Sequence, residues 1–143
     1  MKYLVLIIMV LPCLSFACIR DSDPTGGVPY KERVTEYIKN ADYIFLGRID
    51  AREWKRNPDW QNENPWHYNK ISVIEQFKGS LNSPIEYWPP SSCHEAFSEV
   101  GEYFVIFGYL AAGSIQFPMN SGTISLQYAN EIKLLDILRD WNE

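Results

Sequence analysis

The stretch that decides the fold is DYIFLGRIDAREW, residues 42–54. Aromatic and β-branched residues dominate it, and this composition is typical of a β-strand. Gly47 stands inside the stretch, where a glycine often marks a bulge or a bend. The stretch therefore predicts one long strand that bends near Gly47.

Outward from this strand, the chain predicts a loop and then further strands. KRNPDWQNENPW (55–66) carries two prolines, three asparagines and mixed charge, which is typical of an exposed loop. EYFVIFGYL (102–110) is nearly all apolar, as expected of a strand that is buried on both faces or lies at the centre of a barrel. Four more strands are predicted in HYNKISVIEQFKG (67–79), PIEYWPP (84–90), SIQFPMN (114–120) and TISLQYA (123–129).

Helical periodicity occurs only near the two ends of this strand region. Before it, apolar residues at i, i+3, i+4 and i+7 predict a helix over residues 30–40; they are Val34, Tyr37, Ile38 and Ala41. After it, NEIKLLDILRDWN (130–142) predicts a terminal helix with Asn130 as its cap and apolar positions at Ile132, Leu135, Leu138 and Trp141. The connections are too short for βαβ crossovers. The pattern favours a mainly β fold, a small closed antiparallel barrel with flanking helices.

The first 17 residues, MKYLVLIIMVLPCLSFA, have the order of a secretory signal peptide: a cation, a short apolar run, then small residues. Ser15 and Ala17 occupy the −3 and −1 positions of a cleavage site, so Cys18 becomes the first residue of the mature chain. The mature protein is expected to be secreted, extracellular or periplasmic. The same residues, LSFAC, also fit a permissive bacterial lipobox, so a lipoprotein anchored to the cell surface through Cys18 is the alternative.

Composition limits the classes of function. Removal of residues 1–17 leaves 143 − 17 = 126 residues, enough for one domain (18–143). Without Lys2 the chain has 13 − 1 = 12 basic and 18 acidic residues, a net charge of −6, which disfavours nucleic acid as a partner. Cys18 and Cys93 are then the two remaining cysteines, and in an oxidising compartment they are expected to pair.

Motifs for catalysis are missing from the sequence. It contains no H-x-x-x-H, C-x-x-C or G-x-S-x-G pattern and no phosphate-binding glycine loop, so we expect neither an enzyme nor a cofactor. The two histidines, His67 and His94, have no partner pattern and are expected at the surface or in turns. Trp54, Trp60 and Trp66 flank loop 55–66, either as lids on the core or as an exposed aromatic contact surface.

Several segments resemble one family when they are taken in order. NADYIFLGRI (40–49), ISVIEQFKG (71–79), PPSSC (89–93) and GEYFVIF (101–107), together with a cysteine that opens the mature chain, resemble the N-terminal domain of the tissue inhibitors of metalloproteinases and their netrin-like relatives. The resemblance runs from Cys18 to about Phe107. It implies an OB-fold barrel with flanking helices and a disulfide between Cys18 and Cys93.

The resemblance also implies a mechanism. The α-amine and carbonyl oxygen of Cys18 would chelate the catalytic zinc of a secreted or membrane-bound metalloprotease, and zinc sites of this kind keep one position open. Ile19 would enter the specificity pocket of the target, beside Arg20, Ser91 and Ser92. Arg20 stands where animal members of the family have a further cysteine. The alternative is a binding module without inhibitory activity at the cell surface, and the oligomeric state stays open.

Overall fold

The computed structural model describes residues 30–59, 61, 64–89, 99–117 and 123–141, with side chains from Val34 onward. The expected signal peptide lies outside these residues. The elements are α1 (Tyr30–Asn40), β1 (Tyr43–Lys55), β2 (Trp66–Lys78), β3 (Ile85–Tyr87), β4 (Tyr103–Ala111), β5 (Ser114–Gln116), β6 (Thr123–Ser125), α2 (Leu126–Glu131) and α3 (Leu134–Arg139). The predicted helix over 30–40 is confirmed.

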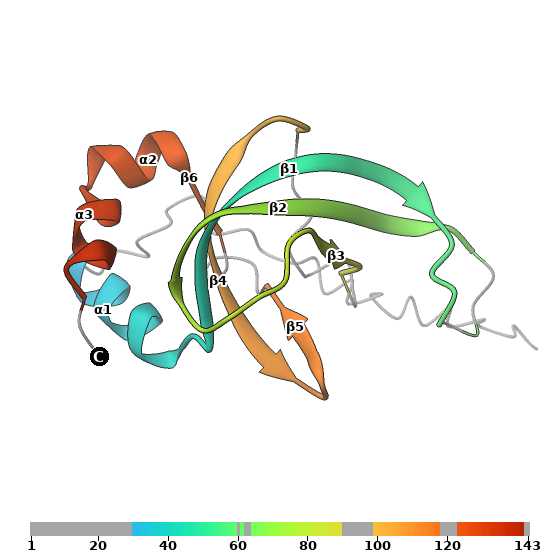
Figure 1. Cartoon of the computed structure of the whole chain (residues 1–143), viewed down its shortest axis with the longest axis horizontal. Helices are drawn as coiled ribbons and strands as arrows, with labels where there is room; N and C mark the ends of the chain where they lie inside the picture. The colour runs from blue at the N-terminus through green and yellow to red at the C-terminus, as the bar shows by residue number, and fades with distance from the viewer. Residues whose placement is uncertain (1–29, 60, 62–63, 90–98, 118–122, 142–143) are drawn as a thin grey trace, which may run out of the picture.

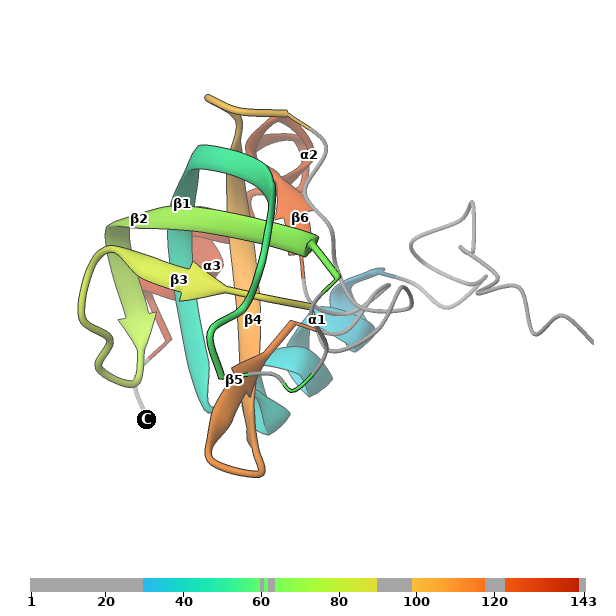
Figure 2. The ribbon, with the colours of Figure 1, turned by 90° about the vertical axis from the view of Figure 1, so that its right-hand side faces the viewer.

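The strands form one curled antiparallel sheet in the order β3-β2-β1-β4-β5, and β6 pairs with β4 (Figures 1 and 2). β1 pairs with β2 over nearly its whole length, and its first half, Tyr43 to Arg48, also pairs with β4. β3 and β5 are the two edges of this path, and no pairing joins them among the described strands. The mainly β, antiparallel prediction is therefore confirmed, while the described sheet is a half-barrel rather than the closed barrel that we expected.

The bend of β1 depends on Gly47. The register with β2 shifts at three places along β1, one of them between Leu46 and Gly47. A Cβ atom at Gly47 would lie 2.8 Å from Cγ2 of Ile71 and 3.1 Å from Cδ1 of Ile106, so neighbouring strands pack directly on the glycine backbone. The predicted bulge is confirmed, and close packing explains the choice of glycine.

β1 and β4 are buried on both faces and separate two hydrophobic cores. Alternate side chains of each strand point to opposite faces. One face packs against the helices, which gather at one end of the molecule (Figure 1), in a core of Val34, Ile38, Ala41, Ile44, Leu46, Val105, Phe107, Ala129, Leu134 and Leu138. The other face fills the half-barrel with Phe45, Ile49, Ile71, Ile85, Tyr87, Ile106 and Phe117. This confirms that residues 102–110 contain a strand buried on both faces.

Polar contacts tie the helices to β2. The Lys78 ammonium donates to the carbonyl oxygens of Ile38 at 3.1 Å and Lys39 at 3.4 Å, near the C-terminus of α1, where a positive charge is favourable. Arg139 at the end of α3 donates two hydrogen bonds to Glu75, of 2.9 and 2.8 Å. Both ends of the described chain are thus attached to the same strand.

The C-terminal prediction was partly wrong. Residues 123–129 were expected to be a strand and 130–142 one helix, but β6 ends at Ser125 and two short helices follow. Ser125, not Asn130, caps α2, because its hydroxyl accepts a hydrogen bond from the Tyr128 amide. Lys133 has a left-handed backbone (φ 57°) and separates α2 from α3, which lets Ala129 and Leu134 bury in the same core. No helix in the described ranges is long and apolar enough to span a membrane.

Replacing Asn69 by leucine is expected to stabilise the fold. Asn69 is fully buried opposite Tyr87, and neither atom of its amide has a hydrogen-bond partner in the described part of the chain. Because a buried polar group without a partner is costly, Asn69→Leu should raise the free energy of unfolding by about 1 kcal/mol in urea titrations. Asn57→Leu is the control: this buried amide accepts a 2.9 Å hydrogen bond from the Asp59 backbone, so its loss should destabilise. Destabilisation by both substitutions would contradict the prediction.

The Glu75–Arg139 contact predicts a dependence of stability on pH. Hydrogen bonds from Arg139 lower the pKa of Glu75 below its ordinary value. The contact therefore contributes fully to the free energy of unfolding above the pKa of Glu75 in the unfolded state, about 4.3. This contribution is lost as the pH falls through the lower pKa of Glu75 in the folded state. Glu75→Gln should lower the melting temperature near neutral pH, and the difference from the wild type should shrink in acid. Glu99→Gln, at an exposed position, is the control; a pH-independent effect of Glu75→Gln would contradict the assignment.

Candidate functional site

The residues of the predicted inhibitory edge lie outside the described part of the chain. Cys18, Ile19 and Arg20 belong to residues 1–29, and Ser91, Ser92 and Cys93 belong to residues 90–98. The structure therefore says nothing of the expected disulfide or of the expected zinc-binding amine. What it does describe is the position from which segment 90–98 starts, at Pro89 after β3.

The end of β3 is held by aromatic and polar contacts with β2. The indole nitrogen of Trp66 donates to the carbonyl oxygen of Pro89 at 2.6 Å. The rings of Tyr68 and Trp88 lie 4.6 Å apart, and the Tyr68 hydroxyl donates to Glu86 at 3.2 Å. Burial, followed by the nearby Glu86 carboxylate, raises the pKa of Tyr68. Segment 90–98 thus starts from a fixed point.

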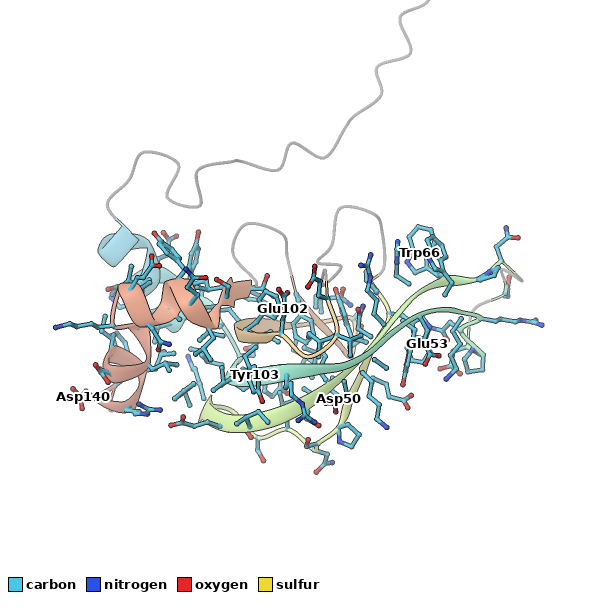
Figure 3. All side chains as sticks on the ribbon, turned by 90° about the horizontal axis from the view of Figure 1, so that it is seen from above. Asp50, Glu53, Trp66, Glu102, Tyr103 and Asp140 are labelled. Carbon is cyan, nitrogen blue, oxygen red and sulfur yellow. The ribbon has the colours of Figure 1, made fainter. Side chains whose placement is uncertain are left out.

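Beyond the half-barrel, β1 and β2 continue as a two-stranded hairpin arm, residues 53–55 and 66–68. Figure 3 shows Trp66 on this arm, far from Asp140 at the helical end. Trp54 is 66% exposed; its ring centroid lies 4.2 Å from that of His67 and 6.4 Å from that of Trp66. For Trp54 the exposed aromatic surface is the correct alternative and a lid on the core is wrong. Trp60 lies outside the described residues.

His67 is a partly exposed residue of the hairpin arm, as the surface alternative predicts, and it lies within β2 rather than in a turn. It is half-buried within β2 beside Trp54, and burial, followed by the positive charge of Arg52, lowers its pKa. The imidazole is therefore neutral around pH 7 and stacks as an aromatic ring. His94 lies outside the described residues.

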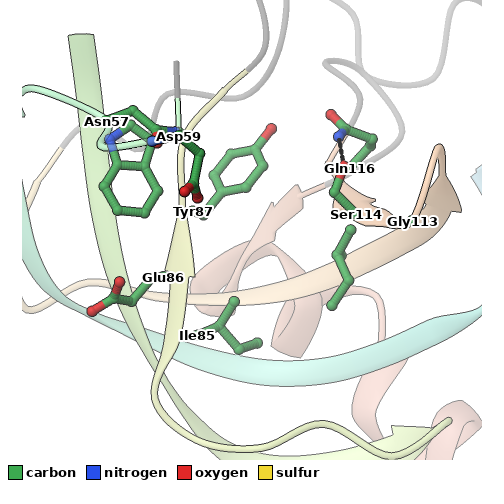
Figure 4. A pocket seen from close by; sticks show the side chains of 10 residues that line it. Asn57, Asp59, Ile85, Glu86, Tyr87, Gly113, Ser114 and Gln116 are labelled. Atoms are coloured by element: carbon green, nitrogen blue, oxygen red, sulfur yellow. Dashed lines mark hydrogen bonds between the residues drawn. The ribbon is translucent and has the colours of Figure 1, made fainter. Parts of the chain in front are cut away.

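A pocket of about 460 Å³ lies between the two edges of the half-barrel. Strands β3 and β5 line it from either side, and Asn57 and Asp59, from the loop after β1, complete the described rim. Figure 4 shows Asn57 and Asp59 on one side of the pocket and Ser114 and Gln116 on the other. The side chains of Ile85 and Ile115 add apolar surface.

Two buried polar atoms of the pocket have no hydrogen-bond partner in the structure as described. They are the indole nitrogen of Trp88, a donor, and Oε1 of Gln116, an acceptor. The amide nitrogen of Gln116 donates to the Ser114 hydroxyl at 2.8 Å, which fixes the side chain (Figure 4). Buried polar atoms are normally paired, and these two, which have almost no accessible surface, are exceptions among the described residues.

Sequence reasoning missed this pocket. Its residues come from the short strands β3 and β5, from residues next to them and from the loop after β1, and they match no motif with fixed spacing. The available signal was weak: PIEYWPP combines an acid with two aromatic residues, which is common in strands without any site. Pairing of β2 with β3 and of β4 with β5 brings these residues to one opening.

Metal ligands do not gather anywhere in the described ranges: no three side chains of His, Cys, Asp or Glu there could hold a metal ion together. The carboxylate of Asp50 instead accepts hydrogen bonds from the Ser72 hydroxyl and from Arg48. These hydrogen bonds lower its pKa and keep it ionised as a structural group.

Comparison with known proteins identifies no family. No protein-family model matches the sequence, and no curated protein matches it at a significant level. The likeness to netrin-like domains therefore depends on the quoted sequence segments alone.

Proposed function

We propose that the chain is an exported, non-enzymatic domain of the netrin-like type that inhibits a zinc metalloprotease through its mature N-terminus. One observation supports this most: the segments that carry the resemblance, residues 40–49, 71–79 and 101–107, fall on β1, β2 and β4, which are neighbours in the sheet. Segments that resemble a family in sequence are thus also assembled together in space.

The strand order supports an OB-fold as the finer description. OB-folds are five-stranded, partly open barrels. Here the first strand pairs with both the second and the fourth, it bends at Gly47, and the sheet curls until its edges face one pocket. The helices cover one face of the central strands and leave the other face to the half-barrel.

In the proposed mechanism, residues 1–17 are removed and a disulfide joins Cys18 to Cys93. The free amine and carbonyl oxygen of Cys18 then bind the zinc of the target in place of water. Ile19 enters the specificity pocket, with Arg20, Ser91 and Ser92 beside it. The anchored Pro89, two residues before Ser91, supports this mechanism, because a fixed starting point reduces the entropy lost on binding.

An extra alanine before Cys18 is expected to abolish inhibition. The insertion moves the α-amine away from the carbonyl of Cys18 and so destroys the chelating pair. The measurement is residual activity of a panel of secreted and membrane-bound zinc peptidases, after intact mass spectrometry has shown a mature chain that starts at Cys18 and is two hydrogens lighter than the reduced form.

An alanine added after Glu143 is the matched control, because it adds the same mass away from Cys18 in the sequence. Equal inhibition by the two extended proteins would exclude amine chelation. A blocked or acylated Cys18 amine in the natural product would also exclude it.

The hairpin arm favours a second candidate function, a binding module at the cell surface. In one version of this proposal, a lipid on Cys18 anchors the module to the membrane. The specific observation is Trp54, whose large apolar side chain is 66% exposed at the end of a protruding pair of strands. Exposed tryptophans are costly in water and are enriched in protein contacts.

Trp54→Ser is expected to reduce binding of the fluorescently labelled protein to the surface of the producing cells by about tenfold or more, because aromatic anchors dominate such contacts. Its melting temperature should stay close to that of the wild type, since the side chain is mostly exposed. Leu110→Ser, at a 55% exposed position at the end of β4, is the control. An equal loss with both variants would contradict a specific role of the arm.

A further inference from the structure

We propose that two copies of the chain pair with each other through the hairpin arm, edge to edge along β1, with Trp54 of one copy opposite Trp54 of the other. The proposal is independent of the inhibitory mechanism, because it depends on described residues alone. It also differs from the second candidate function, since it gives Trp54 a partner in another copy of the chain rather than on a cell.

The outer edge of β1 in the hairpin arm is covered by no described strand. β4 pairs with only the first half of β1. Just beyond, Ile49 donates to the carbonyl oxygen of Glu102 at 3.0 Å and accepts from the amide of Gly101 at 2.7 Å. Over residues 51–55, β2 is the one partner of β1 among the described strands. Such an edge presents backbone N–H and C=O groups to which another strand can add.

This stretch of β1 is regular and accessible. Natural edge strands are often interrupted by proline, glycine or a bulge. Residues 51–55 contain neither proline nor glycine, and no register shift with β2 falls within them. The side chains of residues 52–55 are exposed, and that of Trp54 is 66% exposed. Charged side chains can also protect an edge, so the outcome depends on which charges meet.

Two-fold symmetry limits the registers that can form. Side chains directly opposite each other in an antiparallel pair point to the same face, so two identical strands must place one residue opposite itself. A centre at Arg52, Glu53 or Lys55 places like charges opposite each other, which is unfavourable. A centre at Trp54 places two indole rings opposite each other. It also places Glu53 of each copy opposite Lys55 of the other, so two pairs of opposite charge form.

The paired stretch is limited at both ends. Toward the sheet, the turn before β4 already occupies the edge at Ile49, which excludes a centre at Ala51. Toward the loop, β1 has ended before Arg56, which would lie opposite Arg52 of the other copy. The like charges confine the pairing to the region of residues 53–55. The buried area is then smaller than in a standard interface, so we expect a weak dimer with a Kd of about 10–100 µM.

The central side chains are arranged for this contact. The Trp54 ring lies 4.2 Å from the ring of His67, so pairing joins two such aromatic pairs and removes exposed apolar surface from water. On the other face, the Lys55 ammonium lies 4.4 Å from the centre of the Tyr68 ring. Neither Glu53 nor Lys55 forms an ion pair with another described residue. This self-complementary order, Glu-Trp-Lys, commits the edge to a second copy of the same chain.

The experiment is sedimentation velocity of the purified protein, expressed from the full chain, at concentrations from about 1 µM to about 1 mM. The sample is one that runs as a monomer in a non-reducing denaturing gel, so that cysteine cross-links do not contribute. We expect a reversible equilibrium between monomer and dimer that shifts with concentration.

Two charge reversals test the register. Glu53→Lys places a lysine opposite Lys55, and Lys55→Glu places a glutamate opposite Glu53, twice in each dimer. Each should weaken self-association by about tenfold or more. The two substitutions change the net charge in opposite directions, so an effect of net charge alone would differ in sign between them. An equimolar mixture of the two variants should associate like the wild type, because both cross-strand pairs are then of opposite charge.

Asp140→Lys is the matched control, since it makes the same change of charge as Glu53→Lys at the helical end of the molecule, far from the arm (Figure 3). It should leave the Kd unchanged. Melting curves establish that each variant is folded. If one single reversal does not fold, the variant that carries both reversals takes its place, because it should dimerise like the wild type while the remaining single reversal does not.

The proposal is overturned if the wild type stays monomeric at about 1 mM, if a charge reversal in the arm weakens the dimer no more than Asp140→Lys, or if the mixture of the two variants associates no better than either variant alone. None of these results affects the inhibition assay, which is measured with peptidases.

Discussion

The pairing of β1 with β4 is the contact on which the rest of the structure depends. These two strands separate the two hydrophobic cores. In β4, Val105 and Phe107 face the helices, whereas Ile106 between them faces the half-barrel. A one-residue slip in this register would send each side chain to the opposite face. Correct pairing therefore fixes where the helices can pack and which residues fill the barrel at the same time.

The candidate sites follow from the way this sheet ends. The bend of β1 at Gly47 curls the sheet into the half-barrel. Because β1 is longer than β4, it continues past β4 and forms the hairpin arm with β2. Among the described strands, β3 and β5 pair with one neighbour each, and both line the pocket. Segment 90–98, which carries the proposed inhibitory residues Ser91, Ser92 and Cys93, starts at the end of one of these edges. The start of the segment proposed for protease inhibition therefore lies at the open side of the sheet, next to the pocket.

Much of the fold was readable from residue patterns, because the central elements are strongly periodic. The helix over residues 30–40, the bulge at Gly47 and the doubly buried strand around residues 105–108 were all predicted correctly. The C-terminal region was not predicted correctly. TISLQYA has the composition of a strand, but Ser125 caps a helix within it. Lys133 adopts a left-handed conformation, which the sequence pattern does not indicate. The sequence could not show that Trp54 and Trp66 differ in exposure, because exposure depends on the neighbours of each ring in space. Trp54 is mostly in solvent, whereas the indole of Trp66 donates a hydrogen bond to the backbone of Pro89.

The sequence by itself determined that the chain is acidic and rich in strands, whereas export stays a prediction from residues 1–17. These properties are set by composition and short-range spacing, which need no knowledge of neighbours in space. Only the tertiary structure decided that Trp88 and Gln116 line one pocket, that the buried side chain of Asn69 has no hydrogen-bond partner among the described residues, and that Trp54 stays in solvent. The physical reason is that burial and hydrogen bonding depend on strand register and sheet curl, which bring together residues nearly thirty positions apart in the chain, whereas local propensity acts only along the chain itself.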